Sequence, residues 1–432
     1  MPTFLSTQDP SFDKDFEAFL NLKRDVEEDV DRVVADIISD VRDRGIAAVL
    51  ELTERYDRLS LSPEKVAFSD DEISAAVATV SDAERSALEL AADRIRCYHE
   101  RQVPQDLRWT EPNGASLGWR WTPVDAAGLY VPGGLASYPS SVLMNAIPAQ
   151  VAGVDRLVIC APTPDGQANP LVLLAARLSG VDAVYRIGGA QAIAALAYGA
   201  GPIMPVDKIT GPGNAYVAAA KRRVFGHVGI DMIAGPSEVL IIADADNDPD
   251  WIALDLLAQA EHDANAQSIL VTDDRAFGDA VSRAVDDRLA TLSRREIAGE
   301  SWRDFGAVIH VHNMDAACDV SNRIAPEHLE IQTADPEAVA AGIRHAGAIF
   351  LGAHTPEAIG DYVGGPNHVL PTSGSARFSS GLSVLDFMKR TTIASMTPAA
   401  LKEIGPAAET LATSENLEAH GLSVSARLER LN

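Results

Sequence analysis

A helix that ends in two possible metal-binding side chains is the best-defined chemical signal in this sequence. Asp248 followed by Pro249 predicts a helix start, because aspartate can cap the first N–H groups and proline fits the first helical position. Gln259 then falls on the apolar face of this helix, and His262 lies one turn further on. A buried carboxamide or imidazole needs a partner. The spacing leaves two interpretations open, a metal site or polar core groups that hydrogen-bond to each other.

A second signal is an acid next to a base, Glu327 and His328, directly before a predicted strand over 328–331. Histidine titrates near neutral pH and a carboxylate can activate water, so the pair suits proton transfer. Such a pair also arises by chance, and alone it does not identify a catalytic site. Glu330, inside the predicted strand, is expected to face solvent.

Two further pairs of carboxylate and imidazole lie in distant parts of the chain. Asp361 and His368 flank a glycine-rich turn, and Glu415 and His420 lie near the C-terminus. Together with the two polar residues of the predicted helix, these side chains could converge on one metal ion, although their spacing does not prove it. Because the candidate ligands offer nitrogen and oxygen atoms and no thiolate, the residue types favour zinc.

Four glycine-rich loops, at 132–134, 188–189, 211–213 and 364–366, are predicted to follow strands. Ligands of open α/β sheets bind at the carboxyl ends of strands, where helix N-termini and free backbone N–H groups converge. None of the loops matches the G-x-G-x-x-G fingerprint or the phosphate-binding P-loop. They therefore either line a ligand crevice or are ordinary turns.

The elements that must position these residues fall into three parts. The first hundred residues are expected to be helical, with amphipathic helices over 30–44 and 81–102. From about residue 128, short apolar strands alternate with helices, which is typical of a parallel sheet in an α/β fold, with a domain boundary near residue 235. The tail after 382 is expected to be helical over 397–419, interrupted at Gly405 and Pro406.

The predicted strands span 156–160, 183–187, 208–210, 238–243, 268–272, 308–311, 328–331 and 348–351, and predicted helices between the first of them span 170–178, 190–198 and 214–225.

Composition excludes several classes of function. The formal net charge of −26, from 62 acidic and 36 basic residues, disfavours binding to nucleic acid, and it is also compatible with adaptation to high salt. No apolar run approaches the length of a membrane-spanning helix, and the first residues lack the pattern of a secretory signal. Three widely separated cysteines form neither a disulfide framework nor a zinc knuckle. We therefore expect a cytoplasmic protein.

Taken together, these segments resemble the histidinol dehydrogenase family across nearly the whole chain. The matching stretches are 128–134, 188–193, 211–214, 231–240, 259–262, 325–329, 360–362, 367–371 and the pair Glu415 and His420, with 375–383 typical of bacterial members. Pro366 departs from the cysteine common in related members, but it replaces no functional residue.

The resemblance implies a role for each candidate residue. Zinc would be bound by Gln259, His262 and Asp361 of one chain and by His420 of the partner chain. Glu327 and His328 would be the catalytic pair. NAD would contact Tyr130, Gln191 and Asn214. The substrate would contact the four zinc ligands, His328, and also Ser237, His368 and Glu415.

The resemblance also implies a fold and an activity. The fold would be α/β, with two incomplete Rossmann-like domains, parallel-rich sheets and small helical terminal segments, in an intertwined homodimer with shared active sites. The expected domains are 1–24, an N-terminal helical segment; 25–128 with 236–381, carrying the metal and catalytic residues; 129–235, binding NAD; and 382–432, reaching the partner subunit. The expected reaction is oxidation of L-histidinol through L-histidinal to L-histidine with two NAD, the last step of histidine biosynthesis. The alternative is NAD-dependent oxidation of another small primary alcohol.

Overall fold

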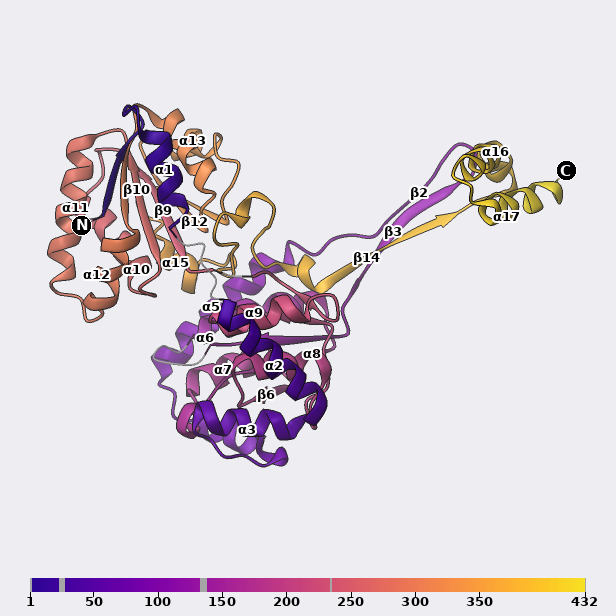
Figure 1. The fold of residues 1–432 in the computed structure, drawn as a ribbon, viewed down its shortest axis with the longest axis horizontal. Coiled ribbons are helices and arrows are strands. Elements are labelled where there is room, and N and C mark those ends of the chain that lie inside the picture. The colour runs from indigo at the N-terminus through magenta and orange to yellow at the C-terminus, as the bar shows by residue number, and fades with distance from the viewer. Residues whose placement is uncertain (1, 23–27, 133–137, 234, 432) are drawn as a thin grey trace. The chain divides into compact units, whose positions relative to one another are not determined.

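The computed structural model describes residues 2–22, 28–132, 138–233 and 235–431 (Figure 1). Within these residues the chain forms two parallel sheets and one antiparallel sheet. The chain divides into two compact units. The large unit comprises Met1–Gln102 and Asp125–Phe387, and the small unit comprises Val103–Val124 and Met388–Asn432.

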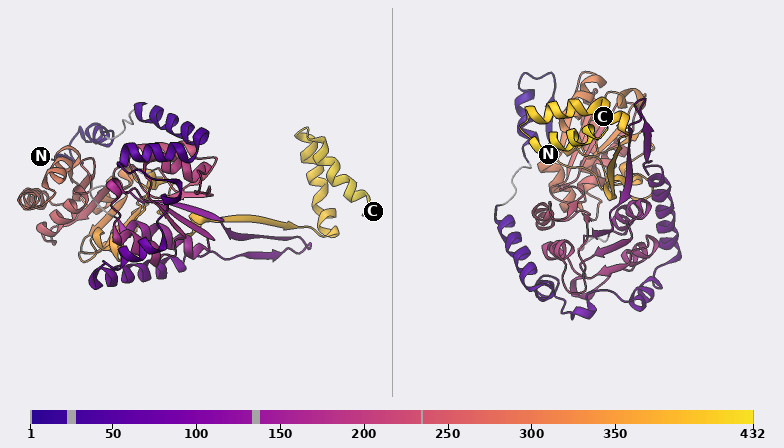
Figure 2. Two further views of the ribbon diagram at one scale, coloured as in Figure 1. Left: turned by 90° about the horizontal axis from the view of Figure 1, so that it is seen from below. Right: turned by 90° about the vertical axis from the view of Figure 1, so that its right-hand side faces the viewer.

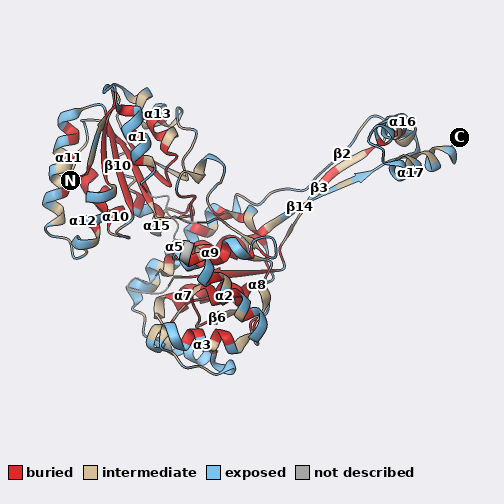
Figure 3. Cartoon of the chain, viewed as in Figure 1, coloured by how far each residue is buried: buried red, intermediate tan, exposed pale blue. Residues whose placement is uncertain are grey.

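The first parallel sheet of the large unit has the strand order β1-β11-β10-β9-β12-β13. Its strands are β1 (Thr3–Ser6), β9 (Glu238–Ala243), β10 (Gln267–Thr272), β11 (Ala307–His310), β12 (His328–Gln332) and β13 (Ala348–Leu351). We call it the six-stranded sheet. Its central strands β9, β10 and β12 are buried along their whole length (Figure 3), as expected for a parallel sheet that is covered on both faces.

Helices cover both faces of the six-stranded sheet because successive strand residues point to opposite sides. Leu240 and Ile242 pack on one face, against α1 (Phe12–Leu20), α13 (Met314–Ile324) and α14 (Pro336–Ala340). Val239 and Ile241 pack on the other face, against α10 (Pro249–Ala260), α11 (Arg275–Leu289) and α12 (Arg295–Phe305). A short helix, α15 (Glu357–Tyr362), follows β13.

The second parallel sheet has the order β6-β5-β4-β7-β8, and we call it the five-stranded sheet. Its strands are β4 (Ala126–Tyr130), β5 (Arg156–Cys160), β6 (Ala183–Tyr185), β7 (Lys208–Thr210) and β8 (Gly229–Ile230). One hydrophobic core joins it to α2 (Glu28–Arg44), α3 (Ile46–Asp57), α8 (Gly189–Tyr198) and α9 (Ala215–Val224). A second group of helices packs together beside β4 and β5: α5 (Asp82–Glu100), α6 (Pro139–Ala152) and α7 (Pro170–Leu178), with α4 (Asp70–Val77) against α7.

The two parallel sheets share one strand order. When the strands of each are numbered along the chain from β4 and from β9, both read 3-2-1-4-5, and β1 is added beyond strand 3 of the six-stranded sheet. Strands 1 and 4 are therefore neighbours in both sheets, β4 with β7 and β9 with β12. This is the point where the chain reverses its direction of travel across the sheet, and open α/β sheets bind ligands there.

The small unit is built differently. Antiparallel strands β2 (Leu107–Thr110), β3 (Ser116–Pro123) and β14 (Met388–Ser395) lead to the paired helices α16 (Pro398–Ser414) and α17 (Glu418–Glu429), drawn in yellow in Figure 2. Every residue of β2 is exposed, and α17 has no buried residue in the described part of the chain. Short 3-10 helices occur elsewhere, at Pro63–Lys65, Pro164–Gly166, Ser375–Arg377 and Val384–Phe387.

The α/β class and the parallel-rich sheets are confirmed, and several elements fall where they were predicted. Strands β5, β7, β9 and β13 have the predicted bounds, and α7 matches its predicted range of 170–178. Helices α2 and α5 confirm the two amphipathic patterns of the first hundred residues. Within the described residues, no helix is long and apolar enough to cross a membrane.

Three predictions about the chain ends were wrong. The N-terminal segment is not purely helical, because β1 pairs with β11 at the edge of the six-stranded sheet. The tail after 382 is not purely helical either, because β14 pairs with β3 over eight residues. Helix α16 also continues through Pro406 and ends instead before Asn416, whose φ of 57° is the left-handed conformation that terminates helices.

The predicted grouping of 25–128 with 236–381 also needs correction. The apolar stripe of α2, with Val34 and Ile38, is buried in the core of the five-stranded sheet, against α8 and α9. The segment 103–124 belongs to the small unit, because β2 and β3 pair with each other and with β14. The predicted boundary between residues 24 and 25 lies outside the described residues.

Candidate active site

His328 is the first residue of β12, and its imidazole is oriented by the neighbouring strand. The Nδ1–H group donates to the carbonyl oxygen of Glu238, the first residue of β9, over 3.1 Å. Because a carbonyl can only accept, the neutral ring carries its proton on Nδ1 and leaves the lone pair on Nε2. Among the described residues, that buried Nε2 atom has no hydrogen-bond partner. Burial lowers the pKa of His328 to about 4, so the ring is neutral near pH 7.

Glu327 lies beside His328 and also bridges β12 and β9. Its Oε2 accepts a hydrogen bond from the Glu238 N–H over 2.9 Å, and the Ser237 hydroxyl also bonds to this carboxyl group. Burial raises the pKa of Glu327 well above its usual range, and nearby Glu238 and Asp361 raise it further, while the two hydrogen bonds lower it. The predicted acid and base are therefore adjacent and buried at the amino edge of the six-stranded sheet.

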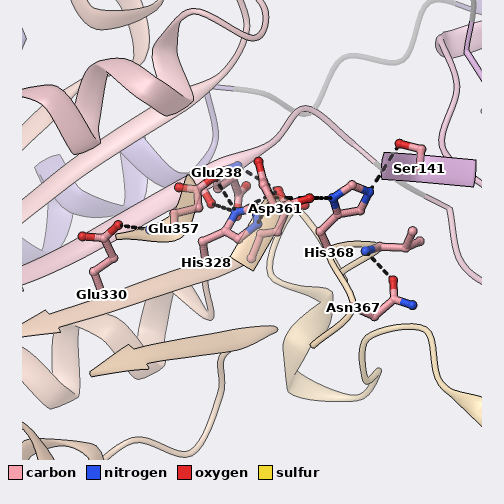
Figure 4. A network of polar contacts seen from close by, with 10 residues as sticks. Ser141, Glu238, His328, Glu330, Glu357, Asp361, Asn367 and His368 are labelled. Carbon is pink, nitrogen blue, oxygen red and sulfur yellow. Dashed lines mark hydrogen bonds and ion pairs between the residues drawn. The ribbon is translucent and has the colours of Figure 1, made fainter. Parts of the chain in front are cut away.

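Asp361 and His368 lie close to this pair (Figure 4). Asp361 Oδ1 is 3.9 Å from His328 Nε2 and 3.8 Å from His368 Nδ1. His368 Nδ1 donates to the Asp361 carbonyl over 3.0 Å, and its Nε2 is 3.3 Å from the Ser141 hydroxyl of α6. Exposed His262 also belongs to this neighbourhood, because its imidazole lowers the pKa of both His328 and His368.

Gln259 is buried near the C-terminus of α10, as its place on the apolar face predicted, and Asp248 and Pro249 begin that helix. Both polar atoms of its carboxamide are buried, and within the described residues neither has a hydrogen-bond partner. An unpaired buried amide costs free energy, so the alternative in which Gln259 bonds to other core polar groups is not supported. Gln259, His262 and Asp361 offer nitrogen and oxygen atoms, and this donor set fits zinc.

A metal could also be considered at His328, Glu357 and Asp361, whose candidate ligand atoms lie within 4.8 Å of one another. Only Asp361 is shared with the predicted zinc ligands. His328 Nδ1 lies 3.5 Å from Glu357 Oε1, and this nitrogen carries the proton that it donates to Glu238. A protonated nitrogen cannot ligate a metal, so Nδ1 is not a ligand in this tautomer, whereas His328 Nε2 keeps its lone pair 3.9 Å from Asp361 Oδ1.

Two glutamates differ from the sequence interpretation. Glu330 was expected to face solvent, but it is completely buried, because β12 is a central strand with helices on both faces. Burial raises its pKa to about 8. Glu357 was not singled out at all, although it is buried and burial raises its pKa well above the usual range. Its spacing of four residues from Asp361 could have identified it, since i and i+4 share one face of a helix.

The residues predicted to bind NAD lie at the carboxyl edge of the five-stranded sheet. Tyr130 ends β4, and its hydroxyl accepts a hydrogen bond from the Gly189 N–H over 3.1 Å. Gln191 is buried in the first turn of α8. Asn214 caps α9 by accepting hydrogen bonds from two backbone N–H groups.

The loop at 211–213 is held firmly beside Tyr130. The buried side chains of Asp231 and Lys221 form an ion pair, and they bind the N–H and the carbonyl of Gly211 respectively. The loops at 188–189 and 211–213 thus follow strands as predicted. The loop at 364–366 instead follows α15, which corrects that prediction, and Gly133 and Gly134 lie outside the described residues.

Glu415 and His420 are the two candidates carried by the small unit. Both belong to the small unit and are exposed, Glu415 at the end of α16 and His420 in α17. Their predicted roles are therefore a matter for proposal.

Comparison with known proteins agrees with the resemblance. The family model for histidinol dehydrogenase matches residues 21–428. Histidinol dehydrogenases from Ruegeria pomeroyi and Cereibacter sphaeroides are 73% and 72% identical over 432 residues, covering 100% of this chain and of each relative. The crystal structure of histidinol dehydrogenase from Elizabethkingia anophelis is 36% identical, has a TM-score of 0.95, and is matched over 100% of this chain and 99% of that one. The resemblance is confirmed: this chain belongs to the histidinol dehydrogenase family.

Proposed function

We propose that this chain oxidises L-histidinol through L-histidinal to L-histidine, with two NAD as hydride acceptors, and so catalyses the last step of histidine biosynthesis. The observation that carries the proposal is His328, a buried neutral imidazole whose Nδ1 is tied to Glu238 and whose Nε2 is left as a base. Glu327 beside it supplies a second proton acceptor. Family membership over the whole chain supports the substrate.

Zinc would be held by Gln259, His262 and Asp361, with His420 of the partner subunit as the fourth ligand. The carboxamide of Gln259, which has no hydrogen-bond partner among the described residues, supports this assignment. When bound, zinc supplies positive charge that favours the ionised forms of the buried carboxyl groups, and a fixed point for the nitrogen atoms of the substrate. Ser237, His368 and the partner's Glu415 would complete the substrate contacts.

NAD would bind at the carboxyl edge of the five-stranded sheet, against Tyr130, Gln191 and Asn214. The strand order 3-2-1-4-5 and the position of Tyr130 and Gly211 beside strands 1 and 4 support a Rossmann-like site. The six-stranded sheet has the same order, so we infer two incomplete Rossmann-like domains. When bound, NAD accepts one hydride from the carbinol carbon in each oxidation.

The residues of this chain would manage the protons. In the first oxidation, His328 Nε2 takes the hydroxyl proton as the carbon loses a hydride, which leaves the aldehyde. An aldehyde cannot lose a second hydride until it is hydrated, so Glu327 takes a proton from the water that adds to the carbonyl carbon. His328 then accepts a proton from the hydrate as the second hydride leaves. The sum is one alcohol, one water and two NAD⁺ giving one carboxylate, two NADH and three protons.

We also propose a homodimer in which the small unit of each chain completes the active site of the other. Glu415 and His420 are exposed in the single subunit. Residues that complete the site of a partner chain have to be accessible in this way before the dimer forms. The helices that carry them expose large apolar side chains, with Leu411 and Leu422 about three-fifths exposed (62% and 59%). Apolar surface of this kind is usually covered by a partner.

The experiment that tests the activity counts products. Purified zinc-replete protein is incubated with L-histidinol and excess NAD, and NADH and histidine are both measured. We expect two NADH per histidine, with activity lost on chelation and restored by zinc. Absence of NADH from histidinol, with bound zinc verified, would contradict the proposed substrate and direct the search to other small primary alcohols.

A second experiment tests the shared site. His420→Asn should lower the zinc content, and so should Gln259→Ala. In a mixed dimer of the two variants, both substitutions fall in the same shared site and the other site is intact. Activity should therefore return when the two variants are refolded together. No recovery in verified mixed dimers would contradict the sharing of sites between subunits.

A further inference from the structure

A second row of polar side chains, buried apart from the half-buried Asp255, lies behind the proposed site and uses the same three elements. On α10 and α15 its members precede the proposed ligands by one helical turn, and on β12 its member follows the proposed base by two residues, so each pair shares a face. The pairs are Asp255 with Gln259, Glu357 with Asp361, and Glu330 with His328.

Hydrogen bonds join this row across the three elements. Glu330 Oε1 accepts from the backbone N–H of Glu357 over 2.7 Å, which ties β12 to the start of α15 (Figure 4). Gln332 Nε2 donates to Glu330 Oε2 over 2.6 Å and to Asp255 Oδ2 over 2.9 Å, which ties β12 to α10. The row therefore links α10, α15 and β12, the three elements that carry Gln259, Asp361 and the proposed base. The remaining proposed ligand of this chain, His262, is exposed and lies just after α10.

The contact to α15 replaces a missing cap. The first N–H groups of a helix have no partner inside the helix, and a polar side chain at the preceding residue usually accepts from one of them. The residue before α15 is Pro356, whose side chain has no acceptor atom. Glu330 of strand β12 supplies this acceptor instead, and it bonds to the N–H of Glu357, the first residue of the helix. Because Glu357 is buried, water cannot take the place of the glutamate as acceptor.

We propose that Glu330 is a positioning residue that holds the first turn of α15 to β12 and thereby fixes Asp361 relative to His328. Gln332 and Asp255 extend the same brace to the helix that carries Gln259. The inference rests on the proposed zinc role of Asp361 and Gln259. A side chain that served only to fill the core would not need an acceptor aimed at a helix N-terminus, and a neutral acceptor of the same shape would serve the proposed role.

The test compares Glu330→Ala, which removes the acceptor, with Glu330→Gln, which keeps a carbonyl oxygen at the same place. Gln332 can turn its amide over to accept from the new side chain, and the link to Asp255 is kept because the protonated Asp255 carboxyl, whose pKa burial raises, can donate to the Gln332 oxygen. Glu337→Ala, an exposed glutamate of α14, is the matched control. Three quantities are measured on full-length protein: the zinc dissociation constant by chelator competition, the visible spectrum of the cobalt-substituted protein, and hydrogen exchange of the segment 357–362 in the metal-free protein.

We expect Glu330→Ala to weaken zinc binding roughly 10- to 100-fold, as losses of partners behind metal ligands usually do, to alter the cobalt spectrum, and to speed exchange at the start of α15. Glu330→Gln and the control should stay close to the parent protein in all three. Equal losses in the Ala and Gln variants, or faster exchange in Glu330→Ala without any change in zinc affinity, would overturn the proposal.

Asp361→Ala separates this inference from the function on which it rests. If zinc affinity is unchanged in Asp361→Ala, the metal assignment fails, and the proposal fails with it. If Asp361→Ala binds zinc weakly but Glu330→Ala binds it normally, only the proposal fails. Should Glu330→Ala not fold, Gln332→Met removes the link to Asp255 at similar volume, and an unchanged cobalt spectrum in that variant would also overturn the proposal.

Discussion

The two parallel sheets have the same strand order, yet their candidate ligand sites lie at opposite edges. In the five-stranded sheet, Tyr130 ends β4 and Gly211 follows β7, so the predicted NAD residues gather at the carboxyl edge. In the six-stranded sheet, Glu238 begins β9 and His328 begins β12, so the predicted catalytic residues gather at the amino edge. Both sites nevertheless lie at strands 1 and 4.

Helix direction gives this difference a physical meaning. Helices α8 and α9 begin at the carboxyl edge of the five-stranded sheet, and the positive ends of their dipoles suit an anionic dinucleotide. Helices α10 and α15 end near Gln259 and Asp361, and the negative ends of their dipoles suit a cation. One strand order can thus serve an anion or a metal ion, depending on the edge that is used.

The largest expected effect comes from the proposed base at the amino edge. We expect His328→Asn to lower kcat about 10²- to 10⁴-fold, the usual contribution of a general base, and to leave the dissociation constant of NAD unchanged. His312→Asn, an exposed histidine after β11, is the control. Steady-state rates measure kcat, and calorimetry measures the dissociation constant of NAD. A large loss of NAD affinity in His328→Asn would show that the sites at the two sheet edges do not act separately.

A smaller effect is expected at the carboxyl edge. Gly211 and Gly226 have φ values of 110° and 101°, so an alanine carries similar backbone strain at either position. A Cβ atom at Gly211 would lie 2.1 Å from the Tyr130 carbonyl oxygen, whereas at Gly226 no described atom lies within 4 Å. Gly211→Ala should therefore raise the KM for NAD on the order of tenfold, equivalent to about 1.4 kcal/mol, with Gly226→Ala as the control. Equal effects of the two substitutions would remove the steric argument.

The smallest effect concerns pH and the buried Glu330. Its pKa is raised from an ordinary value of 4.5 to about 8, so its contribution to stability is full below pH 4.5 and is lost as the pH rises through about 8. Glu330→Gln cannot ionise, and the free energy of unfolding of the metal-free variant should fall less over that range than that of the parent protein. Urea unfolding at several pH values measures this, with Glu337→Gln as the control. Parallel pH profiles would argue against a raised pKa.

Much of the parallel framework could be predicted from the sequence. Buried strands such as β5 and β9 are continuous apolar runs, and the cap at Asp248 fixed the start of α10. The strands of the small unit escaped prediction because they bury almost no residues and so carry no alternation of buried and exposed positions, as the fully exposed β2 illustrates. The position of β1 escaped because four residues at a sheet edge give too short a pattern.

The active-site candidates were predicted through resemblance more than through spacing. The amino edge has no general sequence signal comparable to glycine loops at carboxyl edges, so Glu327 and His328 were weak candidates on their own. Glu330 was misjudged because alternation between core and solvent does not apply to a strand buried on both faces. Glu357 could have been found from its helical spacing to Asp361.

The most direct test of the proposed division of labour is a single turnover of Glu327→Gln with L-histidinol and excess NAD. The variant keeps His328, and the amide oxygen of its residue 327 can still accept the hydrogen bond from the Glu238 N–H. It loses only the carboxylate that we propose activates water. We predict rapid formation of one NADH per active site, followed by a stall at the aldehyde. Two NADH at the parental rate, or equal loss of both oxidations, would contradict the assignment of Glu327 to the hydration step.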